Sequence, residues 1–508
     1  MSPRENDETE YSSETGRRRF LQGVGVVTAT SFVGASSALA APSRKRTPNP
    51  YPKTGSGPSF ESDAYFRHIS ELPSVKRQLE SYEKSGKVGH LMTHDLRQKL
   101  SDSASGTVDL TVSTCGERSE MYSKGQYERP LHGWRPTETE VKELKKYGDV
   151  VFVPDVVSTK VGLSNVAVGD IPKIAALDFV LEIGHDPALE VPDGETNDIS
   201  TQASNPTADD LKTSSHNSFD SEVYDLTTYT QVGVIGTGYP STTSWSKNWA
   251  ESIGIDTNKA KDFVDSDWRT GDSHGTDCAD TVAYMLKEGD PESNLIVPLK
   301  VWDDSDNKVV TSAFRNAIDY ATKNDIPICS TSVETAANEG TCPSTLCEEL
   351  DSYCSAGYMI TCATGNDDKE YEVCHPATSY FTIGVGGYNG SCSGGYSCDP
   401  ASNYGSILYY DDNFNTTYCS WCYNAAGQRS FQPDVYACYS FDTDAGNNIA
   451  GTSFAAPVVA AGGAVHHSVH GSTGYGTHRS KYHGMNNHTV CPSESSNSGD
   501  VLHVPDLT

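Results

Sequence analysis

A serine lies in a segment suited to nucleophilic chemistry, residues 450–457 (Ala-Gly-Thr-Ser-Phe-Ala-Ala-Pro). Gly451 would let the backbone approach a substrate closely, and the small residues after Ser453 would let a helix pack tightly beneath the hydroxyl. We therefore predict that Ser453 is a nucleophile at the N-terminus of a helix. A run of small residues also suits the start of a buried helix, so this prediction depends on partner residues upstream.

The serine segment resembles the nucleophile motif Gly-Thr-Ser-Met-Ala-x-Pro of the subtilisin-like serine peptidases. Residues 272–279 (Asp-Ser-His-Gly-Thr-Asp-Cys-Ala) resemble the His-Gly-Thr-His motif of the same family. The resemblance implies that His274 is the general base, and a histidine suits this role because its ordinary pKa lies near neutrality. A lone histidine before a helix is more often a cap or a surface residue, but its order before Ser453 favours the catalytic interpretation.

A third segment, residues 361–366 (Thr-Cys-Ala-Thr-Gly-Asn), follows an apolar run and resembles the family's Ala-Ala-Gly-Asn motif. The resemblance implies that the Asn366 side chain donates to the developing oxyanion, with the main-chain N–H of Ser453 as the second donor. Taken alone, Gly-Asn is far more often a turn. The three segments follow one another in the order of the family, and weaker matches extend the resemblance over about residues 226–470.

The sequence departs from the family at the first motif. The family carries Asp-Thr-Gly or Asp-Ser-Gly at the end of its first strand, whereas here Gly236 precedes Thr237-Gly238. A glycine has no side chain to hold the imidazole, so the catalytic triad is predicted to be incomplete. Asp272 and Asp277 are the nearby carboxylates that could replace the missing acid, and surface or capping roles are the alternative for both.

Two functions follow from this pattern. The first is a serine endopeptidase that hydrolyses proteins or peptides without a cofactor and is weakened by Gly236. The second is a catalytically silent subtilisin fold that serves as a binding or regulatory protein. The two differ in whether His274 can work without the acid at position 236.

The elements around these residues alternate between strands and helices, which predicts an α/β fold. Apolar runs at 231–235, 295–301, 326–329, 358–363 and 381–385 read as strands, and 274–286, 312–321 and 452–468 read as helices. Near-continuous apolar strands predict a parallel sheet covered by helices on both faces, with functional residues at the carboxyl ends of strands. This peptidase-like domain is predicted over 226–470.

A smaller α+β unit is predicted over 107–190, where a strand–helix–strand pattern occurs twice. By pattern and position it resembles the propeptide that precedes the catalytic domain in many subtilisin-like peptidases, and an unrelated α/β domain is the alternative. The resemblance makes this unit a partner of the active site. Residues 41–106 are expected to be a linker and a helical segment, and 191–225 a polar linker where processing would occur.

The N-terminus is predicted to be a targeting segment. Residues 17–21 (Arg-Arg-Arg-Phe-Leu) precede an uncharged stretch and the small residues Ala38-Leu39-Ala40, the pattern of a twin-arginine export signal over 1–40. The Gly, Ser and Thr content makes the stretch poorly suited to anchor the chain in a membrane. We therefore expect a secreted, extracellular protein.

Composition narrows the classes of partner. The chain has 508 residues, and its 68 acidic and 38 basic side chains give a net charge of −30. Such a surface disfavours nucleic acid and anionic lipid, which need clustered Lys and Arg. An acidic shell keeps proteins soluble at high ionic strength and resembles that of haloarchaeal secreted proteins, with an ordinary acidic secreted protein as the alternative.

Cysteines and acidic loops raise the question of disulfides and metals. Export favours disulfides among the 14 cysteines over a zinc site, because the spacings form no recognised set of four ligands. The family often carries structural Ca²⁺, and a loop such as 411–413 (Asp-Asp-Asn) would permit one. Residues 471–508 are predicted to be a polar tail containing histidines, with a metal-binding tract as the alternative.

Overall fold

The computed structural model describes the small α+β unit, most of the peptidase-like domain and a few isolated residues between them. The described residues are 92, 96, 100, 106–122, 130–155, 158–185, 189–191, 206–212, 219, 230–287, 295–335, 341–342, 346, 349–350, 353–354, 358–367, 373–379, 382–391, 395–398, 402–403, 405–406, 408–410, 416–418, 431–470 and 500–502. The predicted export signal at 1–40 lies outside them.

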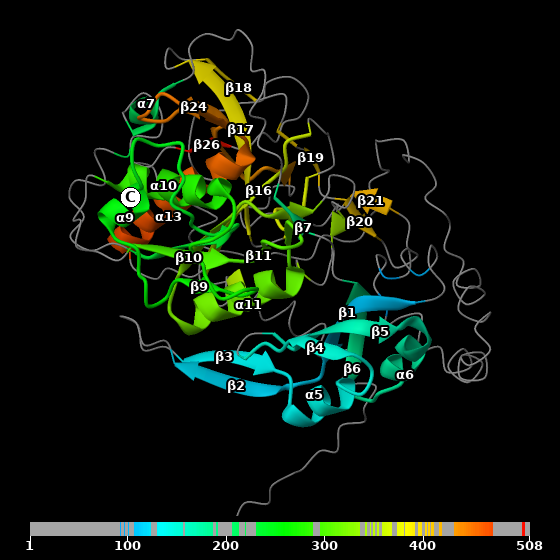
Figure 1. The fold of residues 1–508 in the computed structure, drawn as a ribbon. Helices are drawn as coiled ribbons and strands as arrows, with labels where there is room; N and C mark the ends of the chain where they lie inside the picture. The colour runs from blue at the N-terminus through cyan, green and yellow to red at the C-terminus, as the bar shows by residue number, and fades with distance from the viewer. Residues whose placement is uncertain are drawn as a thin grey trace, which may run out of the picture. The chain divides into compact units, whose positions relative to one another are not determined.

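A nine-stranded sheet forms the centre of the larger domain (Figure 1). Its strands run in the order β26 (Asp500–Val501), β23 (Val435–Cys438), β17 (Ile383–Ser391), β16 (Met359–Ala363), β13 (Ile328–Thr331), β8 (Val232–Gly236), β10 (Ile296–Lys300) and β9 (Lys261–Asp262), with β18 (Gly395–Cys398) beside β17. Every pair is parallel except β17 with β18. The predicted α/β class with a parallel sheet is confirmed.

The strands of this sheet carry apolar side chains on both faces, and helices cover each face. Val232 and Val234 of β8 share a core cluster with α9 (Trp249–Ile253), α10 (Ser273–Leu286) and α13 (Thr452–His470). Ile235 belongs to a second cluster, with α11 (Thr311–Lys323). Side chains along a strand alternate between faces, so position 236 lies on the face of Val232 and Val234, the face of α10 and α13.

The smaller sheet is antiparallel and runs in the order β4 (Asp149–Phe152), β5 (Lys160–Ala167), β1 (Thr107–Thr114), β6 (Val180–His185). Its core also contains residues of α5 (Glu138–Leu144) and α6 (Ile171–Ala175). Within the described chain, none of these four strands joins the nine-stranded sheet. Met92, Leu96 and Leu100 are buried in the same core, so the predicted start at 107 is too late.

The predicted ends of the larger domain also need correction. Ala208 and Leu211 of α7 (Ala208–Lys212), together with Phe219, are buried in the core that contains α10, although 191–225 had the composition of a solvated linker. At the other end, β26 pairs with β23 and Leu502 is buried, so residues 500–502 belong to the sheet rather than to a polar tail. In both places a short apolar segment lies among polar neighbours, and its burial depends on partners distant in sequence.

No helix in the described part of the chain has both the length and the apolar character needed to cross a bilayer.

Candidate active site

Ser453 lies in the first turn of α13, at the end of the sheet where the parallel strands finish. Its side chain is almost fully buried, at 1 % exposure, and its Oγ has no hydrogen-bond partner among the described residues. Ser332 Oγ donates a hydrogen bond to the Ser453 carbonyl oxygen at 2.7 Å, which helps to fix the backbone of this turn. Gly451 precedes the turn with φ +130°, a conformation that other residues rarely adopt. The backbone therefore presents a hydroxyl that no described residue hydrogen-bonds.

Asn366 follows β16 and reaches the same turn. Its Oδ1 accepts hydrogen bonds from the main-chain N–H and the hydroxyl of Thr452, both at 2.9 Å. This pairing leaves Nδ2 on the opposite side of the amide, where it is buried and has no partner among the described residues. A Cβ at Gly451 would lie 3.3 Å from that Nδ2, so the glycine also keeps space open beside the donor. The amide is positioned to donate to an oxygen that enters next to Ser453.

His274 is the second residue of α10, and Asp272 caps the helix by accepting the His274 main-chain N–H at 2.8 Å. Its ring centroid lies 5.4 Å from that of Phe454, the residue after Ser453. Cys278 Sγ lies between the two segments, 3.9 and 4.0 Å from the ring nitrogens of His274 and 3.4 Å from the Ser453 carbonyl oxygen. The structure thus brings His274, Asn366 and Ser453 together, without a direct hydrogen bond between His274 and Ser453 Oγ. Such bonds are often long before substrate binds.

The surroundings of the imidazole favour its neutral form. Burial lowers the pKa of His274 to about 4, and the Asp272 carboxylate acts in the opposite direction. A neutral ring can accept a proton from a serine hydroxyl. The resulting imidazolium would have little compensation, because no carboxylate among the described residues hydrogen-bonds to the ring.

Gly236 ends β8 next to this site. Thr237 connects the strand to the histidine helix: its hydroxyl accepts the Gly275 main-chain N–H at 2.9 Å and donates to the Asp272 carbonyl at 3.0 Å. A Cβ built at Gly236 would meet no atom within 4 Å, and its φ lies outside the left-handed region. Neither sterics nor backbone conformation therefore requires glycine at this position.

The two candidate substitute acids are both engaged elsewhere. Asp272 uses its Oδ1 to cap α10, as described above. Asp277 accepts from the main-chain N–H of Ser244 at 2.6 Å, from the Ser244 hydroxyl at 2.8 Å and from the Thr243 hydroxyl at 3.0 Å. It thereby fixes the loop that follows β8. Neither carboxylate hydrogen-bonds to the His274 ring.

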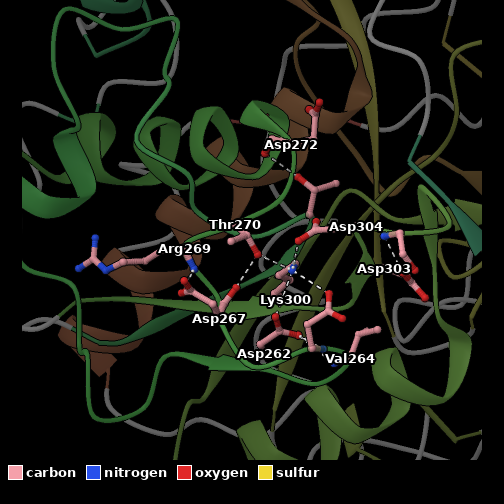
Figure 2. A network of polar contacts seen from close by, with 12 residues as sticks. Asp262, Val264, Asp267, Arg269, Thr270, Asp272, Lys300, Asp303 and Asp304 are labelled. Carbon is pink, nitrogen blue, oxygen red and sulfur yellow. Dashed lines mark hydrogen bonds and ion pairs between the residues drawn. The ribbon is translucent and has the colours of Figure 1, made fainter.

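Sequence reasoning missed a buried lysine that holds the segment leading to His274 (Figure 2). Lys300, at the end of β10, pairs in register with Gly236 and has no exposed side-chain surface. Its Nζ donates to Thr270 Oγ1 at 2.8 Å, Asp304 at 2.9 Å, Asp262 at 3.1 Å and Asp265 at 3.3 Å. The one available signal was a lysine at the end of an otherwise apolar strand.

This network stabilises the loop between β9 and α10. Burial opposes the charge of Lys300, but hydrogen bonds with the Asp304 and Asp262 carboxylates raise its pKa above the ordinary value. Gly238 and Gly271 bring the two loops into contact, with φ of +106° and +113°. A Cβ at Gly271 would collide with the Thr237 carbonyl, so the close approach requires glycine. The position of His274 is set through these backbone contacts.

The predictions for the acidic loop 411–413 and for the histidines after 470 fall outside the described residues. Within the described part of the chain, no group of three or more His, Cys, Asp or Glu side chains could hold a metal ion. Cys278 and Cys329 are buried free thiols.

A family model described as "Subtilase family" (Peptidase_S8) matches residues 208–498. These bounds begin at α7 and extend beyond α13, as the structural core does. No curated protein matches the chain.

Proposed function

The chain belongs to the subtilase family, and we propose that it is a secreted serine endopeptidase whose activity is weakened by Gly236. In this proposal Ser453 Oγ attacks the carbonyl carbon of a peptide bond, and His274 takes the hydroxyl proton and returns it to the leaving amine. The oxyanion is stabilised by Asn366 Nδ2 and by the main-chain N–H of Ser453. No cofactor takes part.

One observation carries this proposal: Ser453 Oγ and Asn366 Nδ2 are two buried polar atoms next to the first turn of α13, and neither has a hydrogen-bond partner among the described residues. Buried polar groups are nearly always hydrogen-bonded, and leaving one unpaired costs about 1–3 kcal/mol. Two such atoms beside a histidine are what an acyl-transfer site needs before substrate arrives. A merely structural turn would have paired them.

The weakened activity follows from Gly236, which we place at the position of the family's triad aspartate. That aspartate holds the correct tautomer of the histidine and stabilises the imidazolium, and its loss in serine peptidases lowers kcat by about 10⁴. Residual catalysis from the oxyanion donors and from substrate binding remains. The expected activity is therefore low but measurable.

The experiment is labelling of the purified full-length protein with an alkyl fluorophosphonate. We expect covalent labelling of Ser453, its loss in Ser453→Ala, and slower labelling by about 10²–10³ in Asn366→Leu, which removes one oxyanion donor. Thr361→Ser, a change beneath the site at a buried hydroxyl that donates to the Ala456 carbonyl, serves as a matched control for packing. Absence of labelling in a folded protein would contradict the proposal.

The second candidate is a catalytically silent subtilase that binds a partner or regulates one. The observation that favours it is the absence of a carboxylate hydrogen-bonded to the His274 ring in the described chain, together with the low pKa of that ring. Labelling separates the two, because a silent protein would not react with the fluorophosphonate even in excess.

We also propose that the unit over about 92–190 is a propeptide and that processing occurs between 191 and 225. Supporting this, β7 (Leu189–Glu190) pairs antiparallel with β14 (Glu334–Thr335), two residues after Ser332. Propeptides of the family are removed by self-cleavage. The N-terminal sequence of the secreted protein tests this: an end within 191–225 in the wild type, and an uncut chain in Ser453→Ala.

We further propose export by the twin-arginine route, supported by residues 17–21, and adaptation to high salt, supported by the net charge of −30. We also propose disulfides among the remaining cysteines, supported by the export signal. Replacing Arg17 and Arg18 with lysine should abolish secretion. Lowering the salt concentration should lower the melting temperature, because screening of the acidic surface is lost.

A further inference from the structure

β14 lies beside the nucleophile. Ser332, whose hydroxyl holds the Ser453 carbonyl at 2.7 Å, is followed by Val333 and then by Glu334 and Thr335 of β14. In the described chain, β14 pairs only with β7. This short strand therefore forms an edge at the site on which an extended peptide can be held by main-chain hydrogen bonds.

Glu334 is unusual for a carboxylate. Its side chain is 4 % exposed, and its Oε2 is buried without a hydrogen-bond partner among the described residues. Burying an uncompensated charge is costly, so buried carboxylates are normally paired with a cation. Burial, followed by the nearby charges of Asp367 and Glu190, raises the pKa of Glu334 well above its usual range. No cation among the described residues pairs with it.

The neighbours of Glu334 add negative charge rather than remove it. Asp367 directly follows the oxyanion donor Asn366, and its main-chain N–H is held by Asn403 at 3.0 Å. Glu190 of β7 stands directly opposite Glu334 in the antiparallel register. Like charges at directly opposed positions destabilise a strand pair. The β7 segment thus pairs with β14 through its main chain, whereas the charge of Glu190 is unfavourable beside that of Glu334.

We propose that Glu334 selects substrates with a lysine or arginine on the acyl side of the scissile bond, held in an extended segment along β14. This inference rests on the proposed peptidase function. A basic side chain at the place now taken by Glu190, or two residues along on the same face of the strand, would supply the cation that Glu334 lacks. Ionic pairing of a buried carboxylate distinguishes a basic side chain from a neutral one of the same length.

The test in trans uses peptidyl diphenyl phosphonates, which label a serine nucleophile after binding as peptides. Lysine and norleucine are compared at each of the four acyl-side positions, and each rate is divided by that of the alkyl fluorophosphonate. We expect lysine to be favoured about 10-fold or more at one position, and Glu334→Gln to bring that ratio close to one. Asp306→Asn, which removes an exposed carboxylate of the peptidase domain, controls for the attraction of a cationic probe to an acidic protein.

The outcomes separate the two levels of inference. If the alkyl probe fails to label Ser453, the peptidase function is wrong. If it labels while lysine gives no advantage at any position, or while Asp306→Asn and Glu334→Gln lower the ratio equally, the specificity proposal is overturned.

A test in cis needs no substrate and covers the case in which β7 blocks the probes. In the full chain, kept uncut by Ser453→Ala, Glu190→Lys places a cation opposite Glu334 and should raise the melting temperature more than Glu190→Gln does. In a Glu334→Gln background the two changes at 190 should have equal effects. An equal effect while Glu334 is retained would overturn the proposal.

Discussion

The hydroxyl of Thr237, the residue after Gly236, accepts the main-chain N–H of Gly275, the residue after His274, at 2.9 Å. The end of β8 and the start of α10 are therefore joined by a hydrogen bond between the Thr237 side chain and the main chain of Gly275, even though no side chain at 236 reaches the imidazole. Position 236 also lies on the sheet face covered by α10 and has room for a Cβ. If position 236 is that of the triad acid, as we propose, the surrounding scaffold has room for the acid that the sequence lacks.

Gly236→Asp should therefore raise peptidase activity, by up to about 10⁴ in kcat. The gain should appear in kcat rather than KM, because a carboxylate stabilises the imidazolium of the transition state rather than the bound substrate. Hydrolysis of a fluorogenic peptide measures it, and circular dichroism confirms folding. Gly236→Asn, of the same size without the charge, should give a much smaller gain. Unchanged hydrolysis in a folded Gly236→Asp protein would contradict the assignment of position 236.

The pH dependence of kcat/KM should change with the same substitution. The base works as a neutral imidazole, and the wild-type pKa of His274 is about 4, so kcat/KM should fall only as the pH drops through about 4. A carboxylate at 236 favours the charged ring and raises its pKa, which moves the fall to higher pH. Steady-state kinetics across the acid range checks both profiles. An identical acid limb in the two proteins would mean that the new carboxylate does not reach His274.

Lys300→Met should destabilise the domain by about 3–5 kcal/mol, because it leaves the buried Asp262 carboxylate without its cation. Asp262, whose side chain is 2 % exposed, is the partner most affected. Chemical denaturation measures the free energy of unfolding. The double variant Lys300→Met with Asp262→Asn should recover part of the loss, since the uncompensated charge is removed. A loss that is the same in the single and double variants would show that packing rather than charge is responsible.

Asp280→Asn should remove a pH-dependent loss of stability. Burial raises the pKa of Asp280 from 3.8 to about 6, so the folded state prefers the protonated acid. Its contribution is fully present below about pH 4 and is lost as the pH rises through about 6, a difference on the order of 3 kcal/mol. An asparagine can accept from Tyr239 and Ala250 and donate to Thr243, the three present partners.

Unfolding free energies measured from about pH 4 to pH 7 should therefore fall less steeply in Asp280→Asn than in the wild type. Asp306→Asn, an exposed carboxylate, provides the comparison. Parallel pH profiles for the wild type and Asp280→Asn would refute the buried-acid explanation.

The sequence by itself determined the family, the α/β class and the order of His274, Asn366 and Ser453, because these features depend on short local patterns. Buried parallel strands appear as uninterrupted apolar runs, and the turn before Ser453 needs Gly451 whatever surrounds it. The absence of an acid at Gly236 was also a local fact. Whether position 236 requires glycine could not be read from the local sequence, because the space around a Cβ depends on every neighbouring segment.

Tertiary structure alone decided the features that depend on distant partners. Of the three carboxylates around Lys300, Asp304 lies four residues away, but Asp262 and Asp265 belong to a distant earlier stretch of chain, so the local sequence does not reveal the full network. From sequence alone, Asp277 could be a substitute triad acid. Only the structure shows that its carboxylate oxygens accept hydrogen bonds from Thr243 and Ser244. The burial of Glu334, Ala208 and Leu502 likewise arises only when the sheet is assembled. The charge of a side chain can be read from the sequence, but whether an oppositely charged group lies beside it depends on the tertiary fold.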